Sequence, residues 1–404
     1  MNIAMINCGL VGSTGKIMRQ TANRTKKDGH NVLLAVSGQP VNKETDTSHI
    51  VHIIGSELSR KINVLLGRIT GLNGCFAYFA TKRFIRQLES FSPDILHLHN
   101  LHESYINLPL LFKYIKKHDV GVVWTFHDCW PFTGHCAQFE HTNCEKWKGQ
   151  CKNCPEVREY PQSFFDNSSF MFKWKKRWFT GIRNLTVVTP SQWLARLVER
   201  SFLREYPIKV INNGIDLNIF KPTDSDFRER HRLQDKVVLL GVAFGWGDRK
   251  GLDVFIHLAG QLDSKYQIVL VGTDNHVDKL LPDNVISIHR TNNQQELAEI
   301  YTAADLFVNP TRQDNYPTVN LEAIACGTPV LTFNTGGSPE IVDNTCGAVV
   351  EKDDVNALQA EIIRICERSP YSKEACLRKA ESFDKSSRFK EYTSLYQSMM
   401  ADLV

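Results

Sequence analysis

Short runs of β-branched and other apolar residues recur along the chain, and segments with helical periodicity lie between them. Runs of this kind are typical of parallel strands that helices cover on both faces. The first series of five runs comprises residues 2–8, 31–37, 94–100, 121–128 and 185–191. The second series comprises residues 237–243, 266–272, 285–290, 306–310 and 329–333. The alternation predicts an α/β protein with two doubly wound parallel sheets.

A linker separates the two series, because residues 208–222 contain Asn-Asn-Gly and Lys-Pro. We predict one domain at residues 1–205, with a Cys-rich insertion at about 134–156, and a second domain at residues 206–383. The last segment, 384–404, carries a helical stripe of large side chains: Phe389, Tyr392, Tyr396 and Met399. Two such domains that face each other would place the carboxyl ends of both sheets around one interdomain cleft, where ligands of these sheets bind.

Composition excludes several classes of protein. The chain has 404 residues, and 48 basic against 44 acidic side chains give a net charge of +4, too small to predict a nucleic-acid binder. The longest apolar runs, such as residues 237–243, are far shorter than a membrane span, and the first residues lack the basic start of a signal peptide. Eleven unevenly spread cysteines indicate cytosolic thiols rather than a secreted disulfide framework.

Glycines follow the first predicted strand, at Gly9, Gly12 and Gly15. Glycine lets the backbone approach a ligand closely, and the helix that follows offers free N–H groups to an anion. The spacing matches neither the dinucleotide fingerprint nor the P-loop. A turn needed only for tight packing remains an alternative.

A second candidate site runs from Asp314 to Glu322, from a strand end into a helix. Pro317 suits a first helical turn, so the N–H groups of this turn would form a phosphate seat. Glu322 could accept hydrogen bonds from ribose hydroxyls, and Asp314 could reach hydroxyls of a transferred sugar. The alternative is an ordinary charged helix start. The predicted seat comprises Asn315, Tyr316, Pro317, Thr318 and Val319.

A third candidate follows the first strand of the second series, where Gly245 precedes the adjacent cations Arg249 and Lys250. A leaving diphosphate needs fixed positive charge nearby, and this loop would supply it. The alternative is an ordinary pair of solvated cations that binds no ligand.

Together these motifs resemble glycosyltransferase family 4, and the resemblance covers nearly the whole chain. The family's acid-x7-acid element is similar to Asp314 and Glu322, with Asp where the family more often has Glu. The supporting similarities are Pro190-Ser191, Asn-Gly-Ile-Asp at 213–216, Lys250-Gly251, Glu-Ala-Ile-Ala-Cys-Gly-Thr-Pro-Val at 322–330 and Gly-Gly-Ser-Pro-Glu at 336–340.

The resemblance implies a retaining transferase of GT-B architecture, two Rossmann-like domains around a cleft, with no essential catalytic metal. It implies a nucleotide-sugar donor, UDP- or GDP-linked, on the second domain, an acceptor on the first, and a last helix that returns to the first domain. The family often has Gly-Arg where this chain has Gly245 and Trp246, so Arg249 is expected to take that cationic role. The implied catalytic residues are Asp314, Glu322, Lys250, Arg249 and His127; Gly12, Gly245 and the 315–319 seat join Glu322 on the donor side.

On the acceptor side, Thr-Phe-His-Asp at 125–128 resembles the family's histidine motif. We expect His127 to position the acceptor, while a buried hydrogen-bonded histidine remains the alternative. His97 and His99 share one face of a strand, and they either line the cleft or satisfy each other at the sheet end. The expected acceptor-side residues are Gly9, His97, His99, His127 and Asp128.

Four cysteines lie within nineteen residues of the insertion, near His127, His135 and His141. Four thiolates can hold a structural zinc ion, although reduced or disulfide-paired cysteines are equally compatible with this spacing. The candidate ligands are Cys136, Cys144, Cys151 and Cys154.

The insertion and the Asp-Asn-Tyr-Pro motif at 314–317 also resemble bacterial family members that build colanic acid and other exopolysaccharides. The resemblance implies a glycan acceptor, expected to be linked to polyprenyl diphosphate, and a cytoplasmic protein at the inner face of the membrane. Residues 164–183 interleave aromatic and basic side chains, which suits an anionic membrane surface or, equally, a core helix with a solvated basic face.

The sequence therefore predicts a glycosyltransferase of surface polysaccharide synthesis that does not bind nucleic acid. Two alternatives remain at this point. A GT-B sugar-nucleotide epimerase would use the same donor without an acceptor. A metal-stapled nucleic-acid-binding or scaffold protein would explain the cysteines but not Asp314, Glu322 and Lys250.

Overall fold

The computed structural model describes residues 1–38 and 49–401. The chain divides into two compact units. Unit 1 comprises Met1–Asn212 and Arg388–Val404, and unit 2 comprises Asn213–Ser387. The division after Asn212 lies seven residues beyond the boundary expected from the sequence.

Unit 1 is built on a seven-stranded, all-parallel sheet with the order β3-β2-β1-β4-β5-β6-β7. Five strands coincide with the predicted runs, whereas β3 and β7 at the two edges were not predicted. Both edge strands are partly exposed, so their sequences lack a continuous apolar run. The strands are β1 (Asn2–Asn7), β2 (Asn31–Ser37), β3 (Ile50–Ile54), β4 (Ile95–Leu98), β5 (Gly121–Thr125), β6 (Leu185–Thr189) and β7 (Ile208–Val210).

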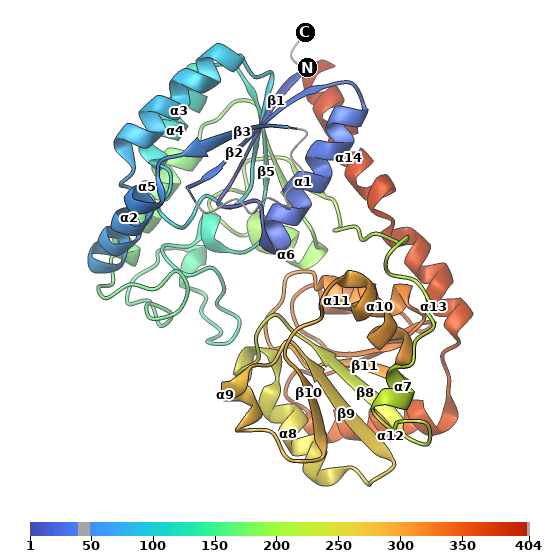
Figure 1. Cartoon of the computed structure of the whole chain (residues 1–404). Helices are drawn as coiled ribbons and strands as arrows, with labels where there is room; N and C mark the ends of the chain where they lie inside the picture. The colour runs from blue at the N-terminus through green and yellow to red at the C-terminus, as the bar shows by residue number, and fades with distance from the viewer. Residues whose placement is uncertain (39–48, 402–404) are drawn as a thin grey trace. The chain divides into compact units, whose positions relative to one another are not determined.

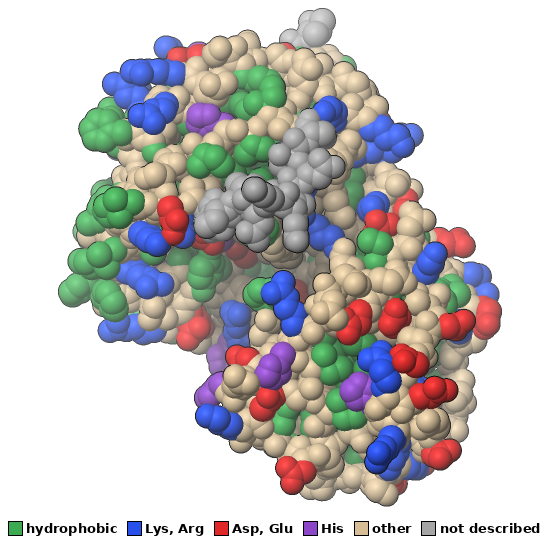
Figure 2. Space-filling view, in the orientation of Figure 1, with side chains coloured by type: hydrophobic (Ala, Val, Ile, Leu, Met, Phe, Trp, Pro, Cys, Tyr) green, Lys and Arg blue, Asp and Glu red, His purple; other side chains and the backbone are tan. Residues whose placement is uncertain are grey.

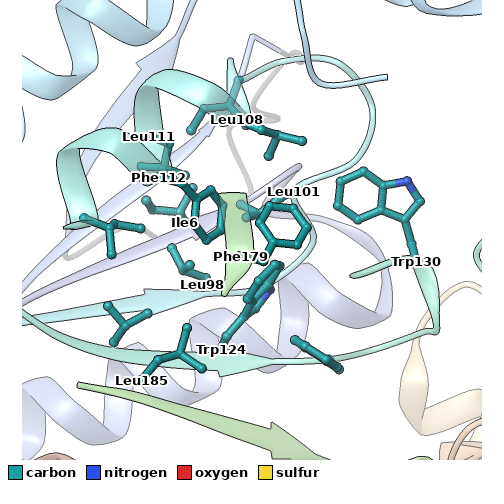
Figure 3. Packing of buried hydrophobic residues seen from close by; sticks show 14 of the residues in the cluster. Ile6, Leu98, Leu101, Leu108, Leu111, Phe112, Trp124, Trp130, Phe179 and Leu185 are labelled. Carbon is teal, nitrogen blue, oxygen red and sulfur yellow. The ribbon is translucent and has the colours of Figure 1, made fainter. Parts of the chain in front are cut away.

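Helices cover both faces of this sheet (Figure 1). On one face, α1 and α14 pack together over the strands through Met18, Phe389 and Tyr396. On the other face, Phe112, Trp124 and Phe179 point toward one another, with ring centroids 4.4 to 5.4 Å apart (Figure 3). The helices are α1 (Gly12–Lys27), α2 (Glu57–Thr70), α3 (Tyr78–Phe91), α4 (Leu108–Lys117), α5 (Ser168–Phe179), α6 (Gln192–Glu199) and α14 (Lys385–Ala401), with 3₁₀ turns η1 (Trp130–Phe132) and η2 (Lys146–Lys148).

Unit 2 contains a six-stranded parallel sheet with the order β10-β9-β8-β11-β12-β13. The chain order reverses direction at β8, whose neighbours are β9 and β11. Loops after such strands form the usual ligand site of a doubly wound sheet. The strands are β8 (Val237–Val242), β9 (Tyr266–Val271), β10 (Val285–Ile288), β11 (Leu306–Asn309), β12 (Val330–Phe333) and β13 (Gly347–Val350).

Two apolar clusters enclose the sheet of unit 2, one on each face. The first includes side chains of α10, α11 and α13, and the second includes side chains of α8 and α12. The helices are α7 (Phe227–Arg230), α8 (Leu252–Gln261), α9 (Asn275–Asp278), α10 (Gln294–Ala303), α11 (Thr318–Ala325), α12 (Val355–Arg368) and α13 (Lys373–Ala380), with 3₁₀ turns η3 (Asp248–Lys250), η4 (Ser338–Glu340) and η5 (Glu381–Phe383).

The prediction of two doubly wound parallel sheets is confirmed. None of the helices within residues 1–38 and 49–401 is both long and apolar enough to cross a membrane.

Candidate active site

Lys250 and Asp314 meet in unit 2, although 64 residues separate them. The Nζ atom of Lys250 lies 2.6 Å from Oδ2 of Asp314, and both side chains are partly exposed. Lys250 ends η3 after β8, and Asp314 follows β11, which pairs with β8. The parallel sheet therefore brings these two predicted catalytic residues together at the carboxyl ends of two neighbouring strands.

Glycines allow the loops around this ion pair to pack closely. Gly336 has φ +58°, and a Cβ atom there would lie 1.7 Å from the carbonyl oxygen of Asp314. Gly337 donates its N–H to that same oxygen at 3.3 Å. Gly251 has φ +73°, and its Cβ atom would lie 2.5 Å from the carbonyl oxygen of Pro310. Any larger residue at Gly251 or Gly336 would displace the backbone that carries Lys250 or Asp314.

Helix α11 begins after Pro317 without a side-chain cap and without an acidic residue in its first turn. The N–H groups at such a helix start, together with the helix dipole, favour an anion. Within the helix, Glu322 is buried and accepts a hydrogen bond from the Tyr301 hydroxyl at 3.2 Å. Burial and the Glu322 charge raise the pKa of Tyr301, which keeps its proton on this bond. The 315–319 seat remains a prediction.

Arg249 and Gly245 are exposed, and Trp246 occupies the position at which the family often has arginine. The Trp246 indole N–H donates to the carbonyl oxygen of Val271 at 3.0 Å, so this residue ties the loop to the end of β9.

Arg312 was not among the predicted site residues. Its guanidinium donates two hydrogen bonds to Asp253 at 2.7 Å and a third to Asp353 at 2.5 Å. The Asp253 bonds raise the pKa of Arg312, which remains a permanent cation beneath the Lys250 loop.

In unit 1, the Gly9–Gly12 turn connects β1 to α1. Asn7 donates to the carbonyl oxygen of Gly9 at 2.8 Å, and Gly12 has φ +77° with open space around its Cβ position. Gly15 has a packing role, because its Cβ atom would lie 2.4 Å from the carbonyl carbon of Leu10. Ligand roles for Gly9 and Gly12 remain predictions.

Asp128 belongs to a chain of hydrogen bonds that the sequence did not reveal. Its Oδ2 atom lies 3.1 Å from Nε2 of His102, whose Nδ1 atom lies 2.7 Å from the Tyr160 hydroxyl. That hydroxyl donates to Glu103 at 3.1 Å. Burial raises the pKa of Asp128, but His102 and the N–H of Trp130 outweigh burial and hold it below the ordinary value. The carboxylate is therefore charged at neutral pH.

His127 lies partly exposed beside His99, with 3.0 Å between Nε2 of His127 and Nδ1 of His99. The two rings stack at an interplanar angle of 11°. Burial lowers the pKa of His127 to about 4, so its ring is neutral at physiological pH. The structure brings His99, His127 and Asp128 to the ends of neighbouring strands, as the sequence predicted.

His97 requires a correction. Its Nδ1 atom lies 2.6 Å from the Tyr396 hydroxyl on α14, and its Nε2 atom lies 2.8 Å from Thr125 Oγ1. The side chain has no exposed surface. His97 therefore anchors the last helix inside unit 1, and the expectation that it faces an acceptor is wrong.

The cysteine cluster forms one small cavity of about 10 Å³, lined by all four predicted ligands. The Cys136 thiol donates to Cys154, an interaction that raises the pKa of Cys136 above its ordinary value, and burial raises that of Cys151 to about 11. Within residues 1–38 and 49–401, no group of three or more His, Cys, Asp or Glu side chains is arranged to hold a metal ion, and no disulfide links the cysteines. The structure thus describes four free cysteines around this cavity, and a structural zinc ion bound by them remains a prediction.

Within the aromatic and basic segment, Ser168–Phe179 forms α5, whose apolar side chains divide between the core and the surface. Met171, Phe172 and Phe179 are buried, whereas Phe170 and Trp174 are exposed. Lys175 is fully buried and donates to the carbonyl oxygens of Trp130 and Thr133 at 2.7 and 3.1 Å. This lysine fixes the loop after Asp128 against the helix.

Comparisons with known proteins give the family of the chain. The family model for glycosyltransferase family 4 matches residues 14–219, and that for glycosyl transferases group 1 matches residues 234–368. WcaC of Escherichia coli (strain K12), named as a colanic acid biosynthesis glycosyl transferase, is 26% identical over 319 residues, or 76% of this chain and 77% of WcaC. D-inositol 3-phosphate glycosyltransferase of Streptosporangium roseum is 30% identical over 223 residues, or 48% of this chain and 51% of that protein.

Solved structures share the architecture at low sequence identity. Sucrose-phosphate synthase from Thermosynechococcus elongatus superposes with a TM-score of 0.75 at 17% identity, covering 99% of both chains. Anabaena HepE in complex with UDP superposes with a TM-score of 0.70 at 15% identity, covering 98% of this chain and 100% of HepE.

The two parallel sheets and these structural relatives define a protein of the GT-B class. Within that class, the chain belongs to glycosyltransferase family 4.

Proposed function

We propose that this protein is a retaining transferase that moves a sugar from a UDP- or GDP-sugar to a hydroxyl of a glycan acceptor during bacterial surface polysaccharide synthesis. The observation that carries the proposal is the Lys250–Asp314 ion pair beside the uncapped start of α11. A cation, a carboxylate and the start of a helix at the carboxyl ends of these strands match the needs of a nucleotide diphosphate and the sugar attached to it.

On the donor unit, Lys250 stabilises the departing diphosphate, and the exposed Arg249 adds a second cation. The 315–319 turn receives a phosphate, Glu322 accepts hydrogen bonds from the ribose, and Asp314 contacts hydroxyls of the transferred sugar. Preorganised charge at a leaving group is worth more than charge that must reorient during the reaction. No catalytic metal is required by these roles.

The acceptor oxygen forms a bond to the anomeric carbon as the bond from that carbon to the phosphate oxygen breaks. The acceptor proton passes to the departing phosphate oxygen, so retention needs no separate protein base. His127, whose ring is neutral at physiological pH and lies beside His99, positions the acceptor. Asp128 and its partners hold the surrounding loop.

The relatives favour the same substrate classes. WcaC is named for colanic acid biosynthesis, and HepE was solved with UDP-glucose. We therefore expect a lipid-linked glycan, carried on polyprenyl diphosphate, as acceptor, and a cytoplasmic enzyme that works at the inner face of the membrane.

Thermal-shift measurements with UDP, GDP, ADP and dTDP, each with and without a divalent metal, test the donor site. A ligand that binds only the native state raises the melting temperature. A metal-independent rise with UDP or GDP is expected. No rise with any nucleotide, in folded protein, would refute the donor-site assignment.

A further inference from the structure

The four cysteines of the insertion line one cavity, although they come from separate parts of its loop. Cys136 follows η1, Cys144 precedes η2, and Cys151 and Cys154 follow η2. The volume of their shared cavity is about 10 Å³, which is the space of a single small ion or water molecule. The fold therefore gathers four sulfur atoms around a space that suits one ion.

Two of these sulfur atoms are positioned to accept backbone N–H groups. The N–H of Gly134 donates to Sγ of Cys151 at 3.2 Å, and that of Glu156 donates to Cys154. The Cys136 thiol and the Glu156 N–H lower the pKa of Cys154 below its ordinary value, although burial opposes them. Such hydrogen bonds favour the thiolate, which is the form of cysteine that binds a metal ion.

The indole of Trp147 also lines the cavity and is buried. Its Nε1 atom has no hydrogen-bond partner among the described residues. A buried donor without a partner is costly, and an indole nitrogen can only donate. A thiolate beside the ring would accept this N–H, so the indole favours a charged sulfur in the cavity.

A buried cation lies beside the same sulfur atoms. The Lys and Arg side chains that Figure 2 shows reach the surface, whereas Lys175 has no exposed area. Its ammonium group donates to two carbonyl oxygens and lies 3.4 Å from the centroid of the Trp130 ring. Burial lowers the pKa of Lys175 to about 7, and the largest opposing effects come from Cys136 and Cys151. A buried ammonium group requires a counter-charge, which thiolates at these two positions would supply.

We propose that the four cysteines of the insertion bind one Zn²⁺ ion as thiolates and form a structural metal site. Each thiol releases its proton to solvent as its sulfur binds the ion. A closed site of four soft sulfur ligands is typical of zinc. Its net charge is negative, which matches the buried ammonium group of Lys175. The ligands are Cys136, Cys144, Cys151 and Cys154.

Binding requires the thiols to close on the ion. Among the residues that the structure describes, no group of side chains is already arranged to hold a metal. A cysteine side chain turns about a single bond, however, and the loop between β5 and α5 contains only the short turns η1 and η2. The thiols can therefore converge without a change in the sheet, and the ion would order a long loop that has little regular structure.

The site would also fix the loop that follows Asp128. The Cys129 N–H donates to the carbonyl oxygen of Ala137 at 2.8 Å, and the Ala137 N–H donates to that of Tyr160 at 3.4 Å. Since Ala137 follows Cys136, the ion would hold the segment that joins Asp128 to Tyr160. Zinc binding itself does not depend on the proposed transfer reaction.

Metal analysis of the full-length protein, purified with a reducing agent, tests the site. The parent should contain about one zinc ion per chain, and Cys136→Ser/Cys151→Ser should lose at least about nine-tenths of it. Cys75→Ser/Cys366→Ser changes two partly buried cysteines outside the insertion, so this control should retain the zinc. Folded, reduced parent protein that takes up no zinc from excess Zn²⁺ would refute the proposal.

Cobalt identifies the ligands without any substitution. Parent protein that has been stripped by a chelator and titrated with Co²⁺ should develop the absorption of a tetrahedral site with four thiolates. Nε2 of His135 lines the same cavity without a hydrogen-bond partner among the described residues, so a spectrum of three thiolates and one imidazole would overturn the four-cysteine set. A disulfide within the cluster, found by mass spectrometry in protein alkylated at cell lysis, would also refute the site.

The buried lysine and the loop give two further measurements. Lys175→Met should weaken zinc binding by about tenfold or more, whereas the exposed control Lys173→Met should not. Equal affinities would overturn the role of Lys175 as counter-charge. Removal of zinc should also speed cleavage of the insertion by trypsin at least about fivefold, since its order depends on the ion. The expected sites are the exposed Lys146, Lys148 and Lys152. Cleavage at an unchanged rate would contradict a structural role for the metal.

Discussion

The ammonium group of Lys250 lies 2.6 Å from the carboxylate of Asp314, across two neighbouring strands of unit 2. Without a donor the two charges compensate each other at a partly exposed site. In the proposed donor site, a diphosphate beside the start of α11 would compete with Asp314 for this cation. The pair therefore keeps Lys250 oriented before the donor binds, and we expect Lys250 to turn toward the phosphate when it does.

Replacement of Lys250 tests its role in the departure of the diphosphate. Lys250→Ala should lower turnover by roughly a hundredfold, because loss of one preorganised charge at the reacting centre has an effect of this size. Release of nucleotide diphosphate under saturating donor gives the measurement. Lys265→Ala, which removes a surface lysine paired with Glu367, is the control and should retain turnover. Near-normal turnover in Lys250→Ala would contradict the assignment.

The proposed contact of Glu322 with the ribose predicts a change in specificity. Glu322→Gln should bind the nucleotide diphosphate about tenfold to a hundredfold more weakly, since hydrogen bonds to a charged group contribute about 1.5–3 kcal/mol. More sharply, the parent should discriminate against the 2′,3′-dideoxy nucleotide and the variant should not. Calorimetric titration of both nucleotides with both proteins measures this. Tyr301→Phe, which keeps the carboxylate but removes its hydroxyl donor, should preserve the discrimination.

The contact between His97 and α14 predicts a difference between two tyrosines of the last helix. Tyr396→Phe removes the 2.6 Å bond and leaves a buried ring nitrogen without a partner, which should lower the free energy of unfolding by about 1–3 kcal/mol. Tyr392→Phe removes a weaker 3.3 Å bond from Thr125 and should cost less. Urea unfolding of both variants tests the order. Equal losses would show that the short bond has no special weight.

The fold could be predicted because central parallel strands must be apolar on both faces, which leaves continuous runs such as those of β1 and β8. The edge strands β3 and β7 could not, since partial exposure removes that signal. Helix α2 shows a different limit. Its apolar periodicity identifies a helix, but only the packing of Gly67 on Ser104 shows that the apolar face is the outer one.

The site was partly predictable for a similar reason. Lys250 and Asp314 each follow a strand, and strand ends of one parallel sheet converge. The two-residue period places His97 and His99 on one face, but it contains no information about α14, which covers His97. The pairing of His102 with Tyr160 was also out of reach, because 58 residues separate them and Tyr160 lies outside any helix or strand.

Two histidines of unit 1, the buried His97 and the partly exposed His127, predict how stability depends on pH. Burial lowers the pKa of His97 to about 3 and that of His127 to about 4, against an ordinary value of 6.5. Between pH 6.5 and about 4 the unfolded chain therefore binds more protons than the folded one, so the free energy of unfolding falls as the pH falls. Each histidine contributes a slope of up to about 1.4 kcal/mol per pH unit in this window. Urea unfolding from pH 7 to pH 4 should show a shallower slope for His127→Gln than for the parent protein. An unchanged slope would mean that the His127 ring is protonated as readily in the folded protein as in the unfolded chain, and the neutral ring required for acceptor positioning would be lost with it.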